Sequence, residues 1–173
     1  MAFKKPIAAV TVPESPDRLF RDLPKRRHPS LFDHQGQMLR NYVAKAINAK
    51  DVALQLPTGS GKTLVGLLLA DWRRRKFREK VVYLCPTSQL VNQVAEEATS
   101  KYGLSIEAFT GKIKDYAPAS KAAYANGDRV AVTNYSSLFN TNPFSMTPIL
   151  LLSTTPMLLR ITSRPSGRCR CHA

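Results

Sequence analysis

The stretch from Val52 to Thr63, with the sequence VALQLPTGSGKT, constrains the fold more than any other part of the chain. A short apolar run ends at a proline, a glycine-rich turn follows, and a lysine and a threonine precede an apolar segment of helical length, residues 64–72. Strand, glycine loop, Lys-Thr and helix in this order are typical of a loop that binds phosphate groups. The alternative is a Gly-Ser turn followed by an ordinary helix. The pattern predicts a strand over 52–56 and a nucleoside triphosphate site at its end.

Each residue type in this loop has a physical reason. Gly59 and Gly61 can adopt positive φ and have no Cβ, so backbone N–H groups can curl around a polyphosphate. Lys62 brings a positive charge to the outer phosphates, and Thr63 offers a hydroxyl to Mg²⁺ beside the positive end of the helix dipole. The predicted cofactors are therefore ATP and Mg²⁺. One position departs from the general pattern, because Leu56 stands where a first glycine is usual.

Charge is distributed unevenly over the 173 residues. The chain holds 26 Lys and Arg against 12 Asp and Glu, and more than half of the net charge of +14 lies in residues 1–30 and 151–173. So basic a balance predicts a polyanionic partner, DNA or RNA, rather than a membrane.

The length suits one α/β domain. No apolar run has the length of a signal peptide or a bilayer span, so the expected location is cytoplasmic.

The first third of the chain leads into the loop. Residues 1–30 carry five prolines among basic side chains, which predicts an extended, basic, proline-rich lead-in. Asp33 is a candidate N-cap for a helix whose apolar residues repeat at helical spacing as far as Ile47. This helix can present Gln35 to a nucleotide, because an amide can pair bidentately with the adenine edge; a surface glutamine is the alternative. The basic cluster within residues 73–78 either complements the dipole of its helix or contacts nucleic acid.

Strands and helices alternate through the rest of the chain. Apolar runs predict strands at 81–85, 105–109, 129–133 and 149–152. Between them, Thr87 or Ser88 caps a helix, residues 112–125 form a broken helix, and Asn134 caps a short one. This alternation predicts an α/β fold with a parallel sheet and helices on both faces. In such folds the loops at the carboxyl ends of the strands carry the site.

Four segments in this order and spacing resemble the first RecA-like domain of superfamily 2 helicases, the DEAD/DEAH-box group in the broad sense. His34 and Gln35 are similar to the glutamine motif that contacts adenine, residues 56–63 to motif I, and residues 86–93 to motif Ia. Residues 110–111 and 132–135 lie where the next strand-end motifs occur. The resemblance covers residues 31–150. DEAD-box members carry Arg-Glu where this chain has Ser-Gln, which argues against that strict subfamily.

The resemblance implies a set of functional residues. The ATP-binding residues would be Gln35, Pro57, Thr58, Gly59, Ser60, Gly61, Lys62 and Thr63, with Thr63 also on Mg²⁺. The sugar-phosphate backbone of DNA or RNA would be gripped, without sequence specificity, by Pro86, Thr87, Ser88, Thr110, Gly111 and Thr133. The resemblance implies no small-molecule substrate other than ATP.

The catalytic carboxylates of the family are missing from the place where they are expected. The strand at 149–152 is followed by Ser153, and residues 129–173 contain no Asp or Glu. In the family these acids order the Mg²⁺ shell and the attacking water. No catalytic residue can therefore be assigned in this chain.

A frameshift is one hypothesis for the tail. A permitted choice of codons for residues 153–163 spells Asp-Asp-Ala-His-Ala-Ala-Glu-Asn-Tyr-Ile when it is read one nucleotide out of phase. That is a motif of the family type in the expected place. Under this hypothesis residues 153–173 are a disordered, frameshifted tail. They stand in place of the rest of a helicase, which would include a second RecA-like domain. Cys169, Cys171 and His172 would then have no function, and no zinc site is expected.

Three functions remain open at this point. In the first, residues 31–152 are the partial ATP-binding domain of an ATP-dependent helicase or translocase, a member of the family that is inactive in this form. In the second, the chain is a non-enzymatic nucleotide-binding fragment. In the third, it is a basic nucleic-acid-binding module with an incidental phosphate loop, against which the presence of motif I beside motif Ia argues. ATP binding and ATP turnover distinguish the three.

Overall fold

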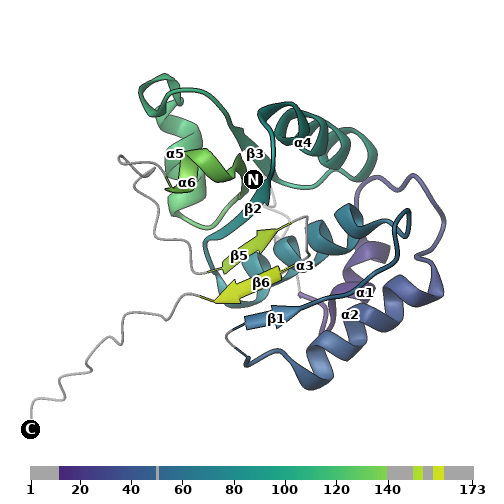
Figure 1. Ribbon diagram of the computed structural model, residues 1–173. Coiled ribbons are helices and arrows are strands. Elements are labelled where there is room, and N and C mark those ends of the chain that lie inside the picture. Colours follow the sequence, from purple (N-terminus) through teal and green to yellow (C-terminus); the bar gives the residue numbers. More distant parts are fainter. Residues whose placement is uncertain (1–11, 50, 140–149, 154–157, 162–173) are drawn as a thin grey trace, which may run out of the picture.

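A six-stranded sheet organises the protein in the computed structural model, which describes residues 12–49, 51–139, 150–153 and 158–161. The order of the strands across the sheet is β1-β6-β5-β2-β4-β3 (Figure 1). The strands are β1 (Asp51–Ala53), β2 (Val81–Cys85), β3 (Ile106–Phe109), β4 (Val130–Asn134), β5 (Leu150–Ser153) and β6 (Leu158–Ile161). The expected α/β architecture is confirmed.

The directions of the strands place their carboxyl ends together. β5, β2, β4 and β3 are parallel, as predicted. β6 runs antiparallel to both β5 and β1, so β1 points the same way as the parallel strands. The loop that follows β1 therefore emerges at the same edge of the sheet as the segments that follow β2, β3, β4 and β5.

Helices cover both faces of the sheet, and the alternation of side chains along β2 shows how. Val81, Tyr83 and Cys85 pack in a core with α3 (Lys62–Phe77) and α4 (Ser88–Tyr102). Val82 and Leu84 point to the other face, where a second core includes residues of β3 and of α5 (Pro118–Ala125). All five residues of β2 are buried, as expected for a central parallel strand. Burial also raises the pKa of the Cys85 thiol to about 12, which leaves it protonated and unreactive.

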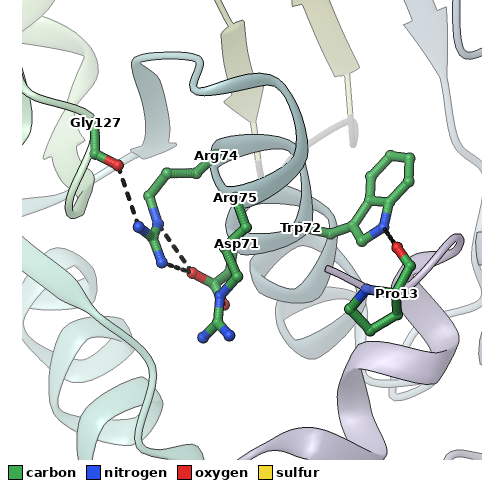
Figure 2. A network of polar contacts seen from close by, with 6 residues as sticks. All are labelled: Pro13, Asp71, Trp72, Arg74, Arg75 and Gly127. Atoms are coloured by element: carbon green, nitrogen blue, oxygen red, sulfur yellow. Dashed lines mark hydrogen bonds and ion pairs between the residues drawn. The ribbon is translucent and has the colours of Figure 1, made fainter. Parts of the chain in front are cut away.

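Part of the N-terminal stretch belongs to the folded body, which corrects the expectation of an extended lead-in over residues 1–30. Residues 16–22 form a short helix, α1 (Pro16–Leu19), and a 3₁₀ turn, η1 (Phe20–Asp22). Leu19, Phe20 and Leu23 are buried in the main core. The indole Nε1 of Trp72 donates a hydrogen bond to the carbonyl of Pro13, 2.8 Å away, and so ties this segment to α3 (Figure 2).

β6 is a second correction, because it lies in the stretch expected to be a disordered tail. Residues 158–161 pair with both β5 and β1 and fill the position between them. The sequence signal was weak, since a four-residue segment with three apolar residues and Arg160 has no period that identifies a strand. Cys169, Cys171 and His172, like the loop predicted at 140–148, lie outside the described residues.

The remaining predicted elements are present, although the strand predicted over 52–56 is observed as β1 and ends at Ala53. α2 spans Asp33–Lys45, with Phe32 rather than Asp33 at its N-cap. Thr87 caps α4 through its Oγ1, which accepts a hydrogen bond from the Leu90 backbone N–H. The broken helix consists of η2 (Ile113–Asp115) followed by α5, and α6 (Tyr135–Phe139) follows Asn134. In the described part of the chain no helix has the length and apolar character needed to cross a membrane.

Candidate nucleotide site and strand-end edge

The phosphate loop has the backbone geometry that its glycines predict. Gly59 and Gly61 have φ values of +79° and +76°, in the left-handed region that favours glycine. Gly61 is also the N-cap of α3, so the helix begins at Lys62 with its first N–H groups directed toward the loop. The Ser60 hydroxyl and N–H both donate to the Pro57 carbonyl, at 2.6 and 3.3 Å, and close the turn.

Lys62 and Thr63 stand at the positive end of the α3 dipole. No acidic partner of Lys62 is found among the residues that the structure describes. A cation at a helix N-terminus is electrostatically unfavourable, and no described carboxylate forms an ion pair with Lys62 to offset it. The side chain of Thr63 hydrogen-bonds with the phenol of Tyr83, which is only 2% exposed. Burial raises the pKa of Tyr83, which keeps this phenol neutral.

Gln35 is turned toward the loop rather than toward solvent. Its Nε2 donates to the Ser60 carbonyl at 2.7 Å, and its Oε1 accepts from the Phe32 backbone N–H at 3.2 Å. A Cβ built on Gly61 would lie 2.3 Å from Gln35 Nε2, so the amide occupies the space that the glycine leaves. Gln35 is 3% exposed, which excludes the alternative of a surface glutamine.

A cavity of about 490 Å³ brings most of the predicted ATP-binding residues together. Its lining includes Gln35, Thr58, Gly59, Gly61, Lys62 and Thr63, whereas Pro57 and Ser60 support the turn from outside the lining. This volume lies in the range of small-molecule sites. A larger cavity of about 940 Å³ lies between α1 and the start of α2 but contains no residue of the loop.

Two ring side chains stand beside the loop: His34, which belongs to the predicted glutamine motif, and Phe32, to which the sequence reasoning gave no role. Phe32 is 60% exposed, and its ring stacks on that of His34 with centroids 5.7 Å apart and planes 11° apart. His34 Nε2 lies 3.2 Å from the Ser60 carbonyl. The signal available in the sequence was an aromatic residue three positions before Gln35, but its exposure could not be inferred from the apolar pattern.

The segments expected to contact nucleic acid line one edge of the sheet. In the parallel register Cys85 pairs with Asn134, and Phe109 pairs with Thr133, so these strands end side by side. The predicted residues Pro86, Thr87 and Ser88 directly follow β2 and are exposed, and Thr110 and Gly111 follow β3. Gly111 has φ +85°, and nothing lies within 4 Å of the position its Cβ would take.

Thr133 does not fit the role predicted for it. Its side chain is 3% exposed, and its Oγ1 donates to the Phe109 carbonyl at 2.7 Å. The next residue is better placed, because Asn134 Nδ2 donates to the Ser88 hydroxyl at 2.8 Å across the strand ends. Asn134 Oδ1 also accepts from the Ser137 N–H and confirms the predicted cap of α6. β4 is a parallel strand inside the sheet and is buried as far as Thr133, so Asn134 at its end is its first half-buried residue.

The basic cluster at the end of α3 is engaged within the protein. Arg73 donates to both carboxylate oxygens of Glu79, at 2.7 and 2.8 Å, and Arg74 and Arg75 flank the Asp71 carboxylate (Figure 2). Burial opposes the charge of Arg73, yet the hydrogen bonds with Glu79 prevail and raise its pKa. Arg73 and Arg74 are 4% and 8% exposed, so these two cations are not available to nucleic acid.

The end of β5 carries a hydroxyl where an acid was expected. Ser153 pairs with Leu84 in the parallel register and so lies at the edge that carries the loop. The described residues contain no group of three metal-ligating side chains. The donor set still suits Mg²⁺ bound mainly through phosphates and water, because that ion keeps several waters and takes few protein ligands. Thr63 would hold it, Lys62 would bind the outer phosphates, and the ion would supply charge neutralisation there.

Comparisons with known proteins agree with this fold. A family model described as type III restriction enzyme, res subunit, matches residues 28–158. The crystal structure of the UvsW helicase from bacteriophage T4 has a similar fold, with a TM-score of 0.56, 17% identity and coverage of 80% of this chain and 48% of that chain. A second structure of T4 UvsW matches with a TM-score of 0.56 and 16% identity, over 80% of this chain and 28% of that chain. A comparison with curated proteins found no match.

Proposed function

The chain belongs to the family of the type III restriction enzyme res subunit, with the RecA-like fold of a superfamily 2 helicase domain, and from this premise we propose that it binds Mg·ATP at the phosphate loop. The observation that carries the proposal is Lys62 at the start of α3, in a cavity with Thr63 and two positive-φ glycines. Only a bound anion would complete the electrostatics of this arrangement.

The strand-end edge is the proposed contact surface for the backbone of DNA or RNA. Ser88 and Asn134 are joined by a hydrogen bond across the ends of β2 and β4, and Thr110 and Gly111 continue the edge. Hydroxyl, amide and backbone N–H donors on such an edge contact phosphates and carry no sequence information. The net charge of +14 adds a nonspecific attraction.

Without an acid after Asp128, we expect the chain by itself to bind nucleotide but not to turn it over. Phosphoryl transfer depends on positioning and charge stabilisation, and the groups that orient Mg²⁺ and water in the family are carboxylates. The non-enzymatic nucleotide-binding role is therefore the second candidate, and the Ser153 end of β5 favours it. We propose that this domain serves a helicase or translocase, which is the activity expected of the family.

Three measurements on the same protein test these proposals. Isothermal titration calorimetry should show Mg·ATP binding, and an ATPase assay with added DNA or RNA should stay at background. Binding to labelled single strands of unrelated sequence should be equal and should fall steeply with salt. A chain ending at Ile161 keeps β6 and removes residues 162–173, so retained binding would show that this basic end is not the contact. Robust turnover would contradict the inactive state, and sequence-selective binding would contradict a backbone contact.

A further inference from the structure

Strand β1, which leads into the phosphate loop, is joined to the rest of the sheet through β6. Among the described strands β6 is the only neighbour of β1, and its other side pairs with β5 (Figure 1). Leu159 lies opposite Val52 of β1 on one side and opposite Leu152 of β5 on the other. The backbone of β1 is therefore tied to the parallel strands by a segment in the stretch that was expected to be a disordered tail.

The two sides of the phosphate loop are anchored differently. On its C-terminal side the loop continues directly into α3, whose apolar residues are buried in the main core. On its N-terminal side residues 54–57 connect β1 to the turn and belong to neither a helix nor a strand. Leu54 and Leu56 are buried in the main core, so this short connection transmits the position of β1 to the turn. A displaced β1 would shift the backbone N–H groups at the start of the turn relative to Lys62.

We propose that β6 positions the nucleotide site: by pairing with β1 it holds the N-terminal side of the phosphate loop in the geometry that binds phosphates. This inference rests on the proposed function of the loop. No atom lies within 4 Å of the position that a Cβ of Gly59 would take, so side-chain packing does not fix the loop there. A loop that is ordered before the ligand arrives saves the cost of ordering it on binding. Because such coupling is reciprocal, bound nucleotide must stabilise β6 by the same factor.

Hydrogen exchange on the whole chain, followed by mass spectrometry with and without saturating Mg·ATP, measures this coupling. We expect the amides of β6 and β1 to exchange about tenfold more slowly when nucleotide is bound. β3 is the internal control, because it is the edge strand at the other end of the sheet and pairs with β4; its exchange should change less than about twofold. Equal exchange of β6 with and without nucleotide would overturn the proposal. Equal slowing of β6 and β3 would also overturn it, because that result indicates general stabilisation.

Leu159→Pro tests the same coupling from the side of β6. Proline removes a backbone N–H, and a strand with a neighbour on each side does not tolerate that loss. We expect the dissociation constant of Mg·ATP, measured by calorimetry, to rise by about tenfold. Leu159→Ala is the matched control, because it shortens the side chain and keeps the N–H, and it should bind Mg·ATP more tightly than the proline variant.

Three readings separate the possible outcomes. Circular dichroism checks that the proline variant folds, and hydrogen exchange on the unsubstituted chain does not depend on that variant. Full affinity for Mg·ATP in a folded Leu159→Pro protein would overturn the role of β6 and leave the function of the loop intact. Absence of Mg·ATP binding by the unsubstituted chain would instead overturn the function of the loop, and the role of β6 with it.

Discussion

The two ends of α3 carry cations in opposite circumstances. At its C-terminal end Arg73 and Arg74 are buried and fully paired, where a positive charge also complements the helix dipole. At its N-terminal end Lys62 meets the positive pole of the dipole and has no acidic partner among the described residues. One helix therefore carries buried cations that stabilise the fold at one end and, at the other, the cation that we propose binds the phosphates.

The difference shows that the number of basic residues in a segment does not identify a binding surface. Arg74 bridges Asp71 and the Gly127 carbonyl (Figure 2). Lys76 lies over the Trp72 ring at 4.8 Å, and its Nζ donates to the Glu14 carbonyl. These contacts connect α3 to the turn before β4 and to the N-terminal segment. The dense cluster is structural, and the isolated lysine is the candidate for function.

The largest expected effect is a loss of stability at the C-terminal end of α3, where Arg73 pairs with Glu79. Glu79→Ala leaves Arg73 buried without its carboxylate, and removing one partner of a buried pair costs about 3–5 kcal/mol. Urea unfolding followed by circular dichroism measures the loss. Arg73→Met combined with Glu79→Leu is the control, because it removes both charges and should recover most of the stability. A loss below about 1 kcal/mol, the usual size for an exposed pair, would show that the pair is solvated.

Lys62→Ala should do the reverse, with a loss of binding and no loss of stability. A hydrogen bond to a charged group contributes about 1.5–3 kcal/mol, so Mg·ATP affinity should fall by at least about tenfold. The unfolding free energy should stay constant or rise slightly, because a cation leaves the positive end of the helix. Lys62→Arg keeps the charge and serves as the matched control. Equal affinity in wild type and Lys62→Ala would remove the phosphate-loop assignment.

Much of the fold and of the phosphate loop can be predicted from the sequence, and the features that cannot be predicted have physical causes. The loop, the strand over 81–85 and the caps at Thr87 and Asn134 were predicted, because glycine, proline and hydroxyl residues act over a few positions. The pairing of Arg73 with Glu79 and of Gln35 with Ser60 could not be predicted, since these contacts depend on how the chain packs. Strand β6 was missed because its antiparallel pairing with β1 and β5 is a tertiary event.

Two glycine variants test the contact between Gln35 and the phosphate loop, at the N-terminal end of α3. Gly59→Ala and Gly61→Ala both place a side chain at positive φ, which costs about 1–2 kcal/mol. Only the Cβ at position 61 meets an atom, Gln35 Nε2 at 2.3 Å, whereas nothing lies within 4 Å at position 59. Gly61→Ala should therefore destabilise the protein more and also displace Gln35 from the Ser60 carbonyl. Equal losses in urea unfolding for the two variants would show that the Gln35 contact has no energetic weight.

The smallest effect concerns Thr63, the one predicted Mg²⁺ ligand. We expect the Thr63 hydroxyl to donate to the Tyr83 phenol, which would leave an oxygen lone pair for the metal. Tyr83→Phe removes that partner without changing the ring, and a single neutral hydrogen bond contributes about 0.5–1.5 kcal/mol. We expect the affinity for Mg·ATP to fall about threefold, while the affinity for ATP measured in EDTA stays unchanged. Thr63→Val is the companion variant, because it removes the ligand itself and should abolish the enhancement by Mg²⁺ altogether. If Tyr83→Phe weakens ATP equally with and without Mg²⁺, the phenol supports the packing of α3 against β2 and does not orient the metal ligand.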